Sequence, residues 1–500
     1  MRKGEGMRVW AKAAALGCAL SASAPALAID PFFPEFGNRR IDVDHYALDL
    51  SVTPRPSRLE ATATLTVVAL DDLDAFRLDL SGLDVSSVRV NGTPAEFRQK
   101  DGKLAVRPKA RIAAGDAFEV VVAYAGAPKP IEDPTDPAYR LGWFAFRGGT
   151  YVVSEPVGAS TFFPANDEPT DKATFSFAVT VPDGYEAVAN GVLEGAGRVA
   201  GGRRFVWRMD QPMTTWLATV QVNRYALLKT STAGGLPLRI YTTAGAGPDD
   251  DERYARAKAM IPFIETIAGP YPFESYGSVT VDDPILNYAL ETQAMSTFPS
   301  GAADEGLVAH ELAHQWFGNA VSVRRWADIW LAEGYATYFE TLWPNRRNAA
   351  DFNRAMRGLY DFAVDRKLGP AVVEDGTQIF SDRVYVRGAL TLYALRLKIG
   401  PQAFNAVTRA FVDRFRGGNA TSEDFIRTAV EVSGDGSVRE LLRAWLYDQP
   451  VPPLPGDDAG AARRRAGPVP RPALVGLGCG RGAHRGAPAV CPGNGAPGAD

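Results

Sequence analysis

The sequence predicts a multidomain chain of α and β class, in which an antiparallel β domain is followed by a mainly helical domain. Residues 40–225 alternate apolar and polar side chains with a period of two, which is typical of half-buried strands. Residues after about 250 carry apolar side chains at spacings of three and four, which indicates amphipathic helices. The length of 500 residues favours several domains over one.

Short turn signals separate the predicted strands. Segments 45–50 and 61–68 alternate clearly, and the dipeptides Asn-Gly at 91–92, Asp-Gly at 101–102 and Asn-Gly at 190–191 tolerate the positive φ that tight hairpins require. We therefore place the β domain at residues 29–228 and the helical domain at residues 229–455.

Five helices are predicted in the second domain, at residues 303–317, 331–342, 383–399, 402–416 and 422–432. We expect Gly318, Pro344 and Gly400 to end the first three of these helices. Thr421, together with the acidic residues that follow it, supplies a predicted N-terminal cap for the last.

The first 28 residues have the pattern of a secretory signal. Basic residues precede an apolar run at 13–20, and small residues at Ala26 and Ala28 predict cleavage near Ala28. A buried N-terminal helix is an alternative interpretation, and Cys18 could instead carry a lipid anchor. We expect a secreted or periplasmic protein without a transmembrane segment, because no later stretch offers about 18 uninterrupted apolar residues.

Composition narrows the classes of partner and the compartment chemistry. The net charge of −4 and the lack of a basic block in the predicted folded region argue against nucleic acid. Cys479 and Cys491, the cysteines that remain after the predicted cleavage, lie in the tail at 456–500, which is rich in Gly, Pro, Ala and Arg and is predicted to be disordered. We expect no disulfide framework and a monomer.

The main chemical signal is the pentapeptide His310-Glu311-Leu312-Ala313-His314 within a predicted helix. Two histidines four residues apart project from the same face and can share a metal ion. Neutral imidazoles suit Zn²⁺, a Zn²⁺ ion with three protein ligands holds an activated water, and Glu311 could take its proton. The alternative is a polar, solvated helix face, which the apolar neighbours Trp316 and Phe317 make less attractive.

A third ligand is expected from another element, and Glu333 begins the next predicted helix in the segment Trp330-Leu331-Ala332-Glu333-Gly334-Tyr335-Ala336. With this pentapeptide and this spacing, the sequence resembles the aminopeptidase N family of zinc metallopeptidases. The resemblance extends over residues 40–455, through Pro164–Pro169, Pro212–Leu217 and His314–Asn319. It implies one Zn²⁺ per chain, held by His310, His314 and Glu333.

The resemblance also implies the fold and the activity. It implies a saddle-like β domain followed by a thermolysin-like catalytic domain, in agreement with the periodicity. Family members often add a large helical C-terminal domain, whereas recognisable sequence here stops near Pro455, so we expect a short member. The implied function is hydrolysis of the N-terminal peptide bond of peptides that carry a free amine.

Two segments resemble the family's substrate-binding motifs. The segment Tyr288-Ala289-Leu290-Glu291-Thr292 stands where the family usually has Gly-x-Met-Glu-Asn, which implies Glu291 as an anchor for the substrate ammonium and Ala289 as part of the same substrate-binding segment. Tyr288 and Thr292 depart from that pattern, which leaves the shape of the first subsite open. In Ser154-Glu155-Pro156, Glu155 is implied as a second anchor; for both glutamates the alternative is an ordinary surface carboxylate.

Tyr385, in Val384-Tyr385-Val386-Arg387-Gly388, resembles the family's tyrosine that stabilises the transition state; the alternative is a packing aromatic. In the implied mechanism Glu311 is the general base for the attacking water, and Tyr385 donates a hydrogen bond to the oxyanion. Asp328 and Glu340 are possible partners for the histidine N–H groups, although both could be solvated helix carboxylates.

Two other functions remain as alternatives. A catalytically silent peptide-binding protein would be favoured by replacement of Glu311 or Tyr385, and both are present. A thermolysin-like endopeptidase would be favoured by the absence of Glu291 and by cleavage of N-terminally blocked peptides.

Overall fold

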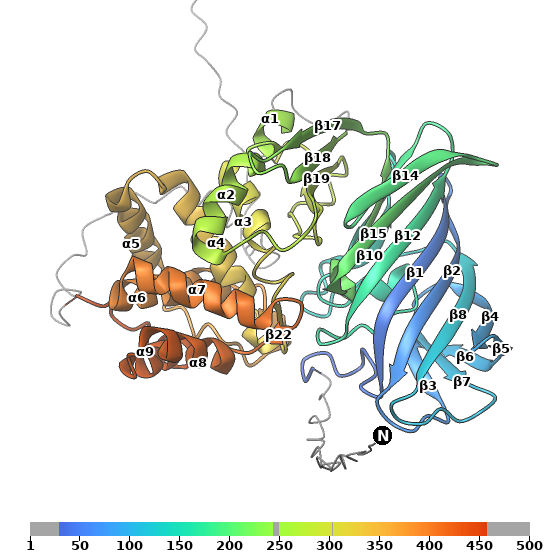
Figure 1. Ribbon diagram of the computed structural model, residues 1–500, viewed down its shortest axis with the longest axis horizontal. Helices are drawn as coiled ribbons and strands as arrows, with labels where there is room; N and C mark the ends of the chain where they lie inside the picture. Colours follow the sequence, from blue (N-terminus) through green and yellow to red (C-terminus); the bar gives the residue numbers. More distant parts are fainter. Residues whose placement is uncertain (1–29, 244–249, 303, 458–500) are drawn as a thin grey trace, which may run out of the picture.

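The structure is a computed structural model that describes residues 30–243, 250–302 and 304–457. A β-rich first part and a largely helical second part lie side by side (Figure 1). The predicted signal at residues 1–28 and residues 458–500 of the predicted tail lie outside the described residues. None of the described helices combines the length and the apolar character needed to cross a membrane.

An eight-stranded sheet forms the body of the first part, in the order β14-β15-β12-β1-β2-β8-β4-β5. Its strands are β1 (Ile41–Pro54), β2 (Ser57–Ala69), β4 (Asp84–Val90), β5 (Thr93–Pro94), β8 (Ala117–Gly126), β12 (Lys172–Val181), β14 (Val192–Val199) and β15 (Gly202–Thr214). All neighbours are antiparallel except β1 and β12, which pair in parallel with Tyr46 opposite Phe175. The predicted antiparallel β domain is confirmed apart from this one pair.

Two smaller sheets complete the first part. One contains β3 (Phe76–Asp79), β7 (Lys103–Arg107) and β6 (Glu96–Lys100). The other has the order β13-β16-β11-β10-β9 and consists of β13 (Glu186–Ala189), β16 (Val220–Asn223), β11 (Thr150–Val153), β10 (Arg140–Ala145) and β9 (Ile131–Glu132). This five-stranded sheet contacts the second part, because the Tyr151 hydroxyl donates to Asp283 and the Gln221 amide donates to Thr297.

The predicted hairpin signals have different outcomes. Asn91 and Asp101 have φ of 49° and 51° and are each followed by a glycine with positive φ, as expected for tight turns. The dipeptide at 190–191 instead connects β13 to β14, which belong to different sheets. Asn190 is fully buried, and its side chain donates to the carbonyls of Leu217 and Gln293. Asparagine here links the two parts instead of closing a hairpin.

The second part begins with a four-stranded sheet that the sequence did not indicate. Its order is β17-β18-β19-β20, from β17 (Ala226–Ser231), β18 (Pro237–Thr242), β19 (Tyr276–Val281) and β20 (Ser296–Pro299), and the last three strands are parallel. Every residue of β19 is buried, so a period of two is absent there. The domain boundary predicted between residues 228 and 229 falls inside β17, which pairs with β18.

Helices make up most of the rest of the second part (Figure 1). They are α1 (Asp250–Tyr254), α2 (Ala257–Ala268), α3 (Glu305–Ala313), α4 (Trp330–Asn345), α5 (Ala349–Asp365), α6 (Gly388–Ile399), α7 (Pro401–Phe415), α8 (Ser422–Ser433) and α9 (Ser437–Tyr447). The two-residue strands β21 (Ser322–Val323) and β22 (Asn419–Ala420) pair in parallel. The predicted cap of α8 is present as a capping box between Thr421 and Asp424.

Several predicted helix ends differ from the structure. The first predicted helix begins at Glu305 and ends at Ala313, because Asp304 caps it and the chain then turns toward Gly318. Pro344 does not end α4 but lies in its last turn. The third predicted helix begins with a π-helical segment, Arg383–Arg387, before α6.

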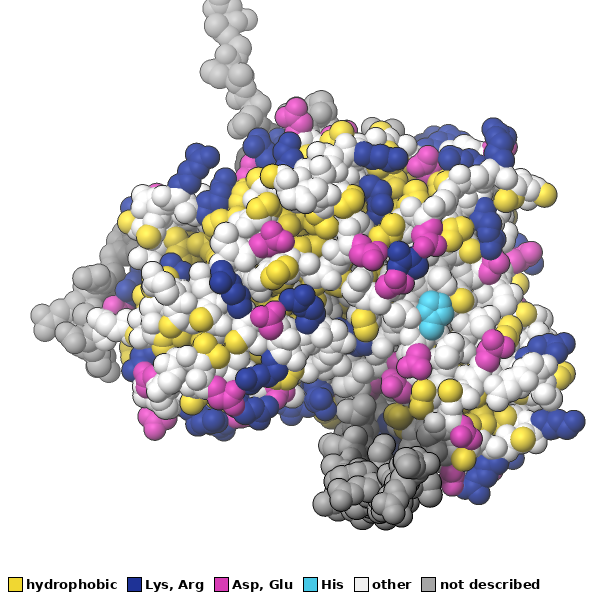
Figure 2. Space-filling view, in the orientation of Figure 1, with side chains coloured by type: hydrophobic (Ala, Val, Ile, Leu, Met, Phe, Trp, Pro, Cys, Tyr) yellow, Lys and Arg dark blue, Asp and Glu magenta, His cyan; other side chains and the backbone are white. Residues whose placement is uncertain are grey.

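The surface carries charges of both signs. Figure 2 shows Lys and Arg side chains interspersed with Asp and Glu side chains over both parts of the visible face. This face therefore presents mixed charge, without the single-sign field that steers a polyanion.

A buried carboxyl in the first part makes stability depend on pH. Thr215 Oγ1 donates to Asp167 Oδ1 at 2.6 Å, and burial raises the pKa of Asp167 to about 7. Because this pKa lies above its ordinary value, the associated stability is present in acid and is lost as pH rises toward and through 7. As the pH rises from 4 to 8, the free energy of unfolding of Asp167→Asn should increase by about 2–4 kcal/mol relative to that of the parent.

Urea unfolding at several pH values measures this difference, with Asp84→Asn at an exposed position of β4 as the control. A constant offset between Asp167→Asn and the parent at every pH would contradict the prediction.

Candidate active site

The two histidines of the pentapeptide lie at the C-terminal end of α3. The side chain of Asp304 accepts from the backbone N–H groups of Gly306 and Leu307 at 2.7 and 3.3 Å, which fixes where the helix begins. His310 and His314 are then one turn apart, with ring centroids 4.9 Å from each other. Both are buried, so neither belongs to a solvated helix face.

Glu333, in the first turn of α4, completes the cluster. Its Oε2 lies 3.3 Å from His310 Nε2 and 3.4 Å from His314 Nε2. Ligand atoms about 2.0–2.1 Å from a tetrahedral Zn²⁺ ion are about 3.3–3.4 Å apart, so these three atoms have the spacing of a zinc site. The structure brings together the three residues that the sequence predicts as ligands.

A close contact between two helices places Tyr385 beside this cluster. Gly334 in α4 faces Gly388 at the start of α6, where a Cβ on Gly334 would lie 2.7 Å from the carbonyl carbon of Gly388. Only glycine permits this approach. Glu333 and the π-helical segment that carries Tyr385 are therefore held next to each other by main-chain contact.

Tyr385 stacks against His310, with ring centroids 6.2 Å apart and planes inclined by 22°. Burial, together with the negative charges of Glu333 and Glu155, raises the pKa of Tyr385 well above its usual value. The phenol therefore keeps its proton over the pH range in which most enzymes work. It can act as a neutral hydrogen-bond donor toward the cluster of His310, His314 and Glu333.

Arg387 anchors the segment that carries Tyr385. It is fully buried, and its guanidinium donates to the carbonyl oxygens of Leu368, Ala444, Trp445 and Asp448. Three of these carbonyls lie at the C-terminal end of α9, where the last carbonyls of a helix are free to accept hydrogen bonds from side chains. The sequence analysis did not predict a role for Arg387. Its position two residues after the predicted catalytic Tyr385 was the signal that could have indicated one.

The histidines have different hydrogen-bond partners on the far side of the cluster. His310 Nδ1 lies 3.0 Å from Glu340 Oε2, and His314 Nδ1 lies 3.1 Å from the carbonyl oxygen of Phe317. Such contacts orient imidazole ligands and select their tautomer. Of the two carboxylates that the sequence left open, Glu340 has this position. Asp328 instead binds Arg325 and Ser422.

Three further glutamates face the cluster from different elements. Glu311 follows His310 on α3, Glu291 precedes β20, and Glu155 follows β11 of the first part. Carboxylate oxygens of Glu155, Glu291 and Glu333 lie within 4.8 Å of one another, and so do ligand atoms of Glu291, Glu311 and His314. Both parts of the chain therefore contribute to one site.

The segment around Glu291 is joined to β20 by an isolated β-bridge. Leu290 exchanges two backbone hydrogen bonds with Thr297, and Ala289 beside it is half-buried. Tyr288 packs with Phe144 and Tyr151 of the first part in a small apolar cluster. The Thr292 hydroxyl donates to the carbonyl of Met295, so this departure from the family motif closes the turn after Glu291.

The balance of charge in the site calls for a cation. Oε1 of Glu291 and Oε2 of Glu311 are buried and make no hydrogen bond among the described residues. Burial raises the pKa of Glu311 to about 8, against the opposing effect of the two histidines. Several buried carboxylates that converge on two imidazoles favour a cation, and the donor set of two nitrogens and one oxygen suits Zn²⁺.

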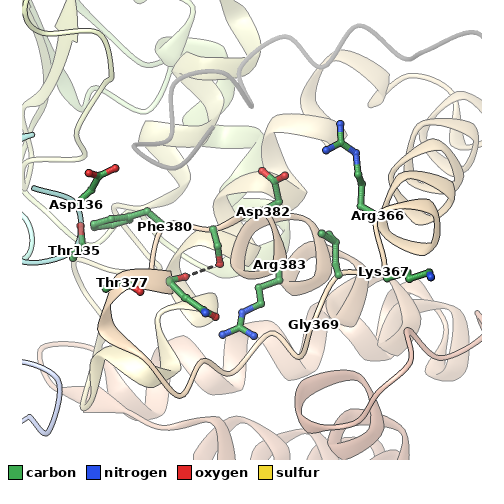
Figure 3. A pocket seen from close by; sticks show the side chains of 12 residues that line it. Thr135, Asp136, Arg366, Lys367, Gly369, Thr377, Phe380, Asp382 and Arg383 are labelled. Carbon is green, nitrogen blue, oxygen red and sulfur yellow. Dashed lines mark hydrogen bonds between the residues drawn. The ribbon is translucent and has the colours of Figure 1, made fainter. Parts of the chain in front are cut away.

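A separate cavity of about 430 Å³ lies beside the π-helical segment (Figure 3). It is lined by residues of the loop after α5, by residues that precede Tyr385, and by Thr135 and Asp136 of the first part. In Figure 3 the carboxylates of Asp136 and Asp382 point away from the guanidinium of Arg383. None of the predicted site residues lines this cavity, so it is distinct from the metal cluster.

Sequence and structure comparisons place this geometry among known proteins. The peptidase M1 N-terminal domain matches residues 42–217, and the peptidase family M1 domain matches residues 254–445. The M1 zinc metallopeptidase of Deinococcus radiodurans has a TM-score of 0.80 at 33% identity, over 85% of this chain and 98% of that chain. A mutant of that protein bound to Tyr-Ser-Ala has a TM-score of 0.79 at 32% identity, over the same shares.

Curated relatives are longer proteins. Aminopeptidase A of Gloydius brevicauda is 29% identical over 338 residues, which are 61% of this chain and 34% of that protein. Aminopeptidase M1-A of Oryza sativa subsp. japonica is 30% identical over 328 residues, 60% of this chain and 37% of that protein. The chain thus spans about a third of the length of these relatives.

A β-rich part beside a helical part that holds a buried His-His-Glu cluster is the arrangement that the matched zinc metallopeptidase structures define as a class. The chain belongs to peptidase family M1.

The contact between Glu340 and His310 predicts a difference between two variants. Glu340→Gln removes a charged acceptor from the N–H of a zinc ligand and should weaken Zn²⁺ binding about 10- to 100-fold. Asp328→Asn, at the other carboxylate near the ligands in sequence, should leave Zn²⁺ affinity unchanged. Competition with a chromogenic chelator measures both affinities, and equal losses in the two variants would refute the assignment.

Proposed function

We propose that this protein is a zinc-dependent aminopeptidase that hydrolyses the N-terminal peptide bond of peptides. The observation that carries the proposal is the convergence of Glu155 and Glu291 on the metal cluster, with their carboxylates within 4.8 Å of Glu333. A free substrate amine is a cation, and buried carboxylates beside the scissile bond select for it through charge-assisted hydrogen bonds. Ala289 offers its main chain to the first residues of the peptide.

His310, His314 and Glu333 would hold Zn²⁺, which would supply Lewis acidity and lower the pKa of a bound water to about 7. Glu311 takes the proton of the attacking water and returns it to the leaving amine. Tyr385 donates its phenolic proton in a hydrogen bond to the developing oxyanion. Glu291 and Glu155 hold the ammonium so that the first peptide carbonyl meets these groups.

The relatives support this function in two ways. Two relatives are aminopeptidases by name, and the Deinococcus radiodurans mutant binds the tripeptide Tyr-Ser-Ala as substrate. This chain covers 98% of that structure, which makes the tripeptide a suitable first probe.

The direct test uses chromogenic amides of several amino acids beside the same amides acetylated at nitrogen. We expect cleavage of the free-amine set only, loss of cleavage with a zinc chelator, and a decrease of at least about 100-fold with Glu311→Gln, because a positioned general base contributes about 10²–10⁴. Restoration by added Zn²⁺ controls for damage by the chelator.

The same panel separates the other functions. Cleavage of the acetylated amides would indicate an endopeptidase. Binding of Tyr-Ser-Ala without turnover by the zinc-loaded protein would indicate a peptide-binding protein.

Tyr385→Phe tests the oxyanion contact separately. Removal of one donor that acts mainly in the transition state should lower kcat about 10²- to 10³-fold with little change in KM. Steady-state kinetics on the best free-amine amide measure both constants, and the neighbouring Tyr393→Phe on α6 serves as control. An increase in KM at constant kcat would instead assign Tyr385 to ground-state binding.

A further inference from the structure

Lys172 crosses from the first part to the turn that follows the zinc-site helix. It begins β12, and its Nζ donates to the carbonyl oxygens of Asn319, Ala320 and Gly418 at 2.8, 3.3 and 3.3 Å. Burial of the ammonium lowers the pKa of Lys172 to about 7. In its protonated form the side chain has three donors, and three main-chain acceptors of the second part match them.

The turn that Lys172 holds is closed tightly around His314. The N–H of Asn319 donates to the carbonyl of His314 at 3.0 Å, and His314 Nδ1 contacts the carbonyl of Phe317. Gly318 has φ of 119°, and a Cβ there would lie 3.2 Å from His314 Nδ1. Ala320 and Val321 also donate to the carbonyls of Gln315 and Trp316, so the turn is tightly closed within the second part, and Lys172 connects it to the first part.

The same turn also holds the main chain of Glu291. Asn319 is fully buried, and its Nδ2 donates to the carbonyl oxygen of Glu291 at 2.7 Å. Gln315 Nε2 donates to the same oxygen at 3.2 Å. Oε1 of Glu291 makes no hydrogen bond among the described residues and lies 3.7 Å from His314 Nδ1, so the hold on its main chain contributes to where the carboxylate lies.

We propose that Lys172 and Asn319 are positioning residues for recognition of the substrate amine. Lys172 fixes the turn against the first part, which also carries Glu155. Asn319 in that turn then holds the main chain of Glu291 through its hydrogen bond to the Glu291 carbonyl. The two ammonium-binding glutamates are thereby kept at a constant separation although they lie in different parts of the chain. This inference rests on the proposed aminopeptidase function.

The required precision is high because a misplacement of about 1 Å in a reacting complex can cost about 100-fold in rate. A loosened Glu291 should affect substrates and ligands that carry a free amine, whereas the zinc cluster keeps its own ligands. The expected signature is lost selectivity for the amine at constant Zn²⁺ content.

The test uses the zinc-loaded full chain with four variants. Lys172→Met and Asn319→Leu remove the donors at similar side-chain size, Lys172→Arg retains a cation with several donors, and Lys229→Met on the exposed strand β17 is the matched control. Calorimetry measures the binding of L-arginine and of N-acetyl-L-arginine, and kinetics measure an aminoacyl amide beside its analogue without the α-amino group. Metal analysis and thermal unfolding accompany each variant.

We expect Lys172→Met and Asn319→Leu each to weaken binding of L-arginine about tenfold and to raise KM for the free-amine substrate, with Zn²⁺ content unchanged. Lys172→Arg should recover most of the loss, and Lys229→Met should resemble the parent. If Lys172→Met does not fold, Asn319→Leu carries the test alone.

Three results would overturn the inference. These are unchanged amine selectivity in folded Lys172→Met and Asn319→Leu, equal loss for amine-bearing and amine-free compounds, and loss of Zn²⁺ in place of selectivity. A parent protein that shows no preference for the free amine contradicts the proposed function itself and is recognised before any variant is made.

Discussion

The arrangement of the second part depends on one electrostatic constraint: several buried carboxylates converge on two imidazoles. Glu291, Glu311 and Glu333 come from three different segments, and each is almost completely buried. Removing carboxylates from water is costly unless a cation or hydrogen-bond donors compensate. The pairing of α3 and α4 therefore creates a cation site as well as an apolar contact between two helices. A metal ion that binds there contributes to folding as well as to chemistry.

The site is shared by two parts of the chain, and polar side chains with main-chain partners connect them. Asn190 reaches the carbonyl of Gln293, Lys172 reaches the turn after α3, and Asn419 Nδ2 donates to the carbonyl of Pro169 at 2.8 Å. Hydrogen bonds to main-chain atoms restrict relative sliding more than apolar contacts do, because they are directional. One continuous buried core also runs through both parts. Glu155 of the first part therefore lies beside Glu333 of the second.

The zinc ligands could be predicted from sequence because a helix places residues four apart on one face, and only the distant Glu333 needed a spacing known from a family. Elements with a regular period were also predictable, although Pro344 and Gly318 misled about where α4 and α3 end. The sheet β17–β20 was missed because β19 is buried at every residue and β17 is largely exposed, so neither strand has the half-buried pattern that marks the first part. Asn319 and Arg387 could not be assigned from sequence, because their roles consist of hydrogen bonds to carbonyls far away in the chain.

The contact between Gly334 and Gly388 has a consequence for how this site can change. Where two helices are separated by side chains, substitution can adjust their spacing in steps of a methylene group. Here backbone meets backbone, so the separation between Glu333 and Tyr385 has no side chain through which it can be tuned. The spacing between Glu333 and Tyr385 therefore stays constant, and substrate preference can vary only through the residues that surround them. The region around Tyr288, which departs from the family pattern and packs against Phe144 and Tyr151 of the first part, is where such variation can occur.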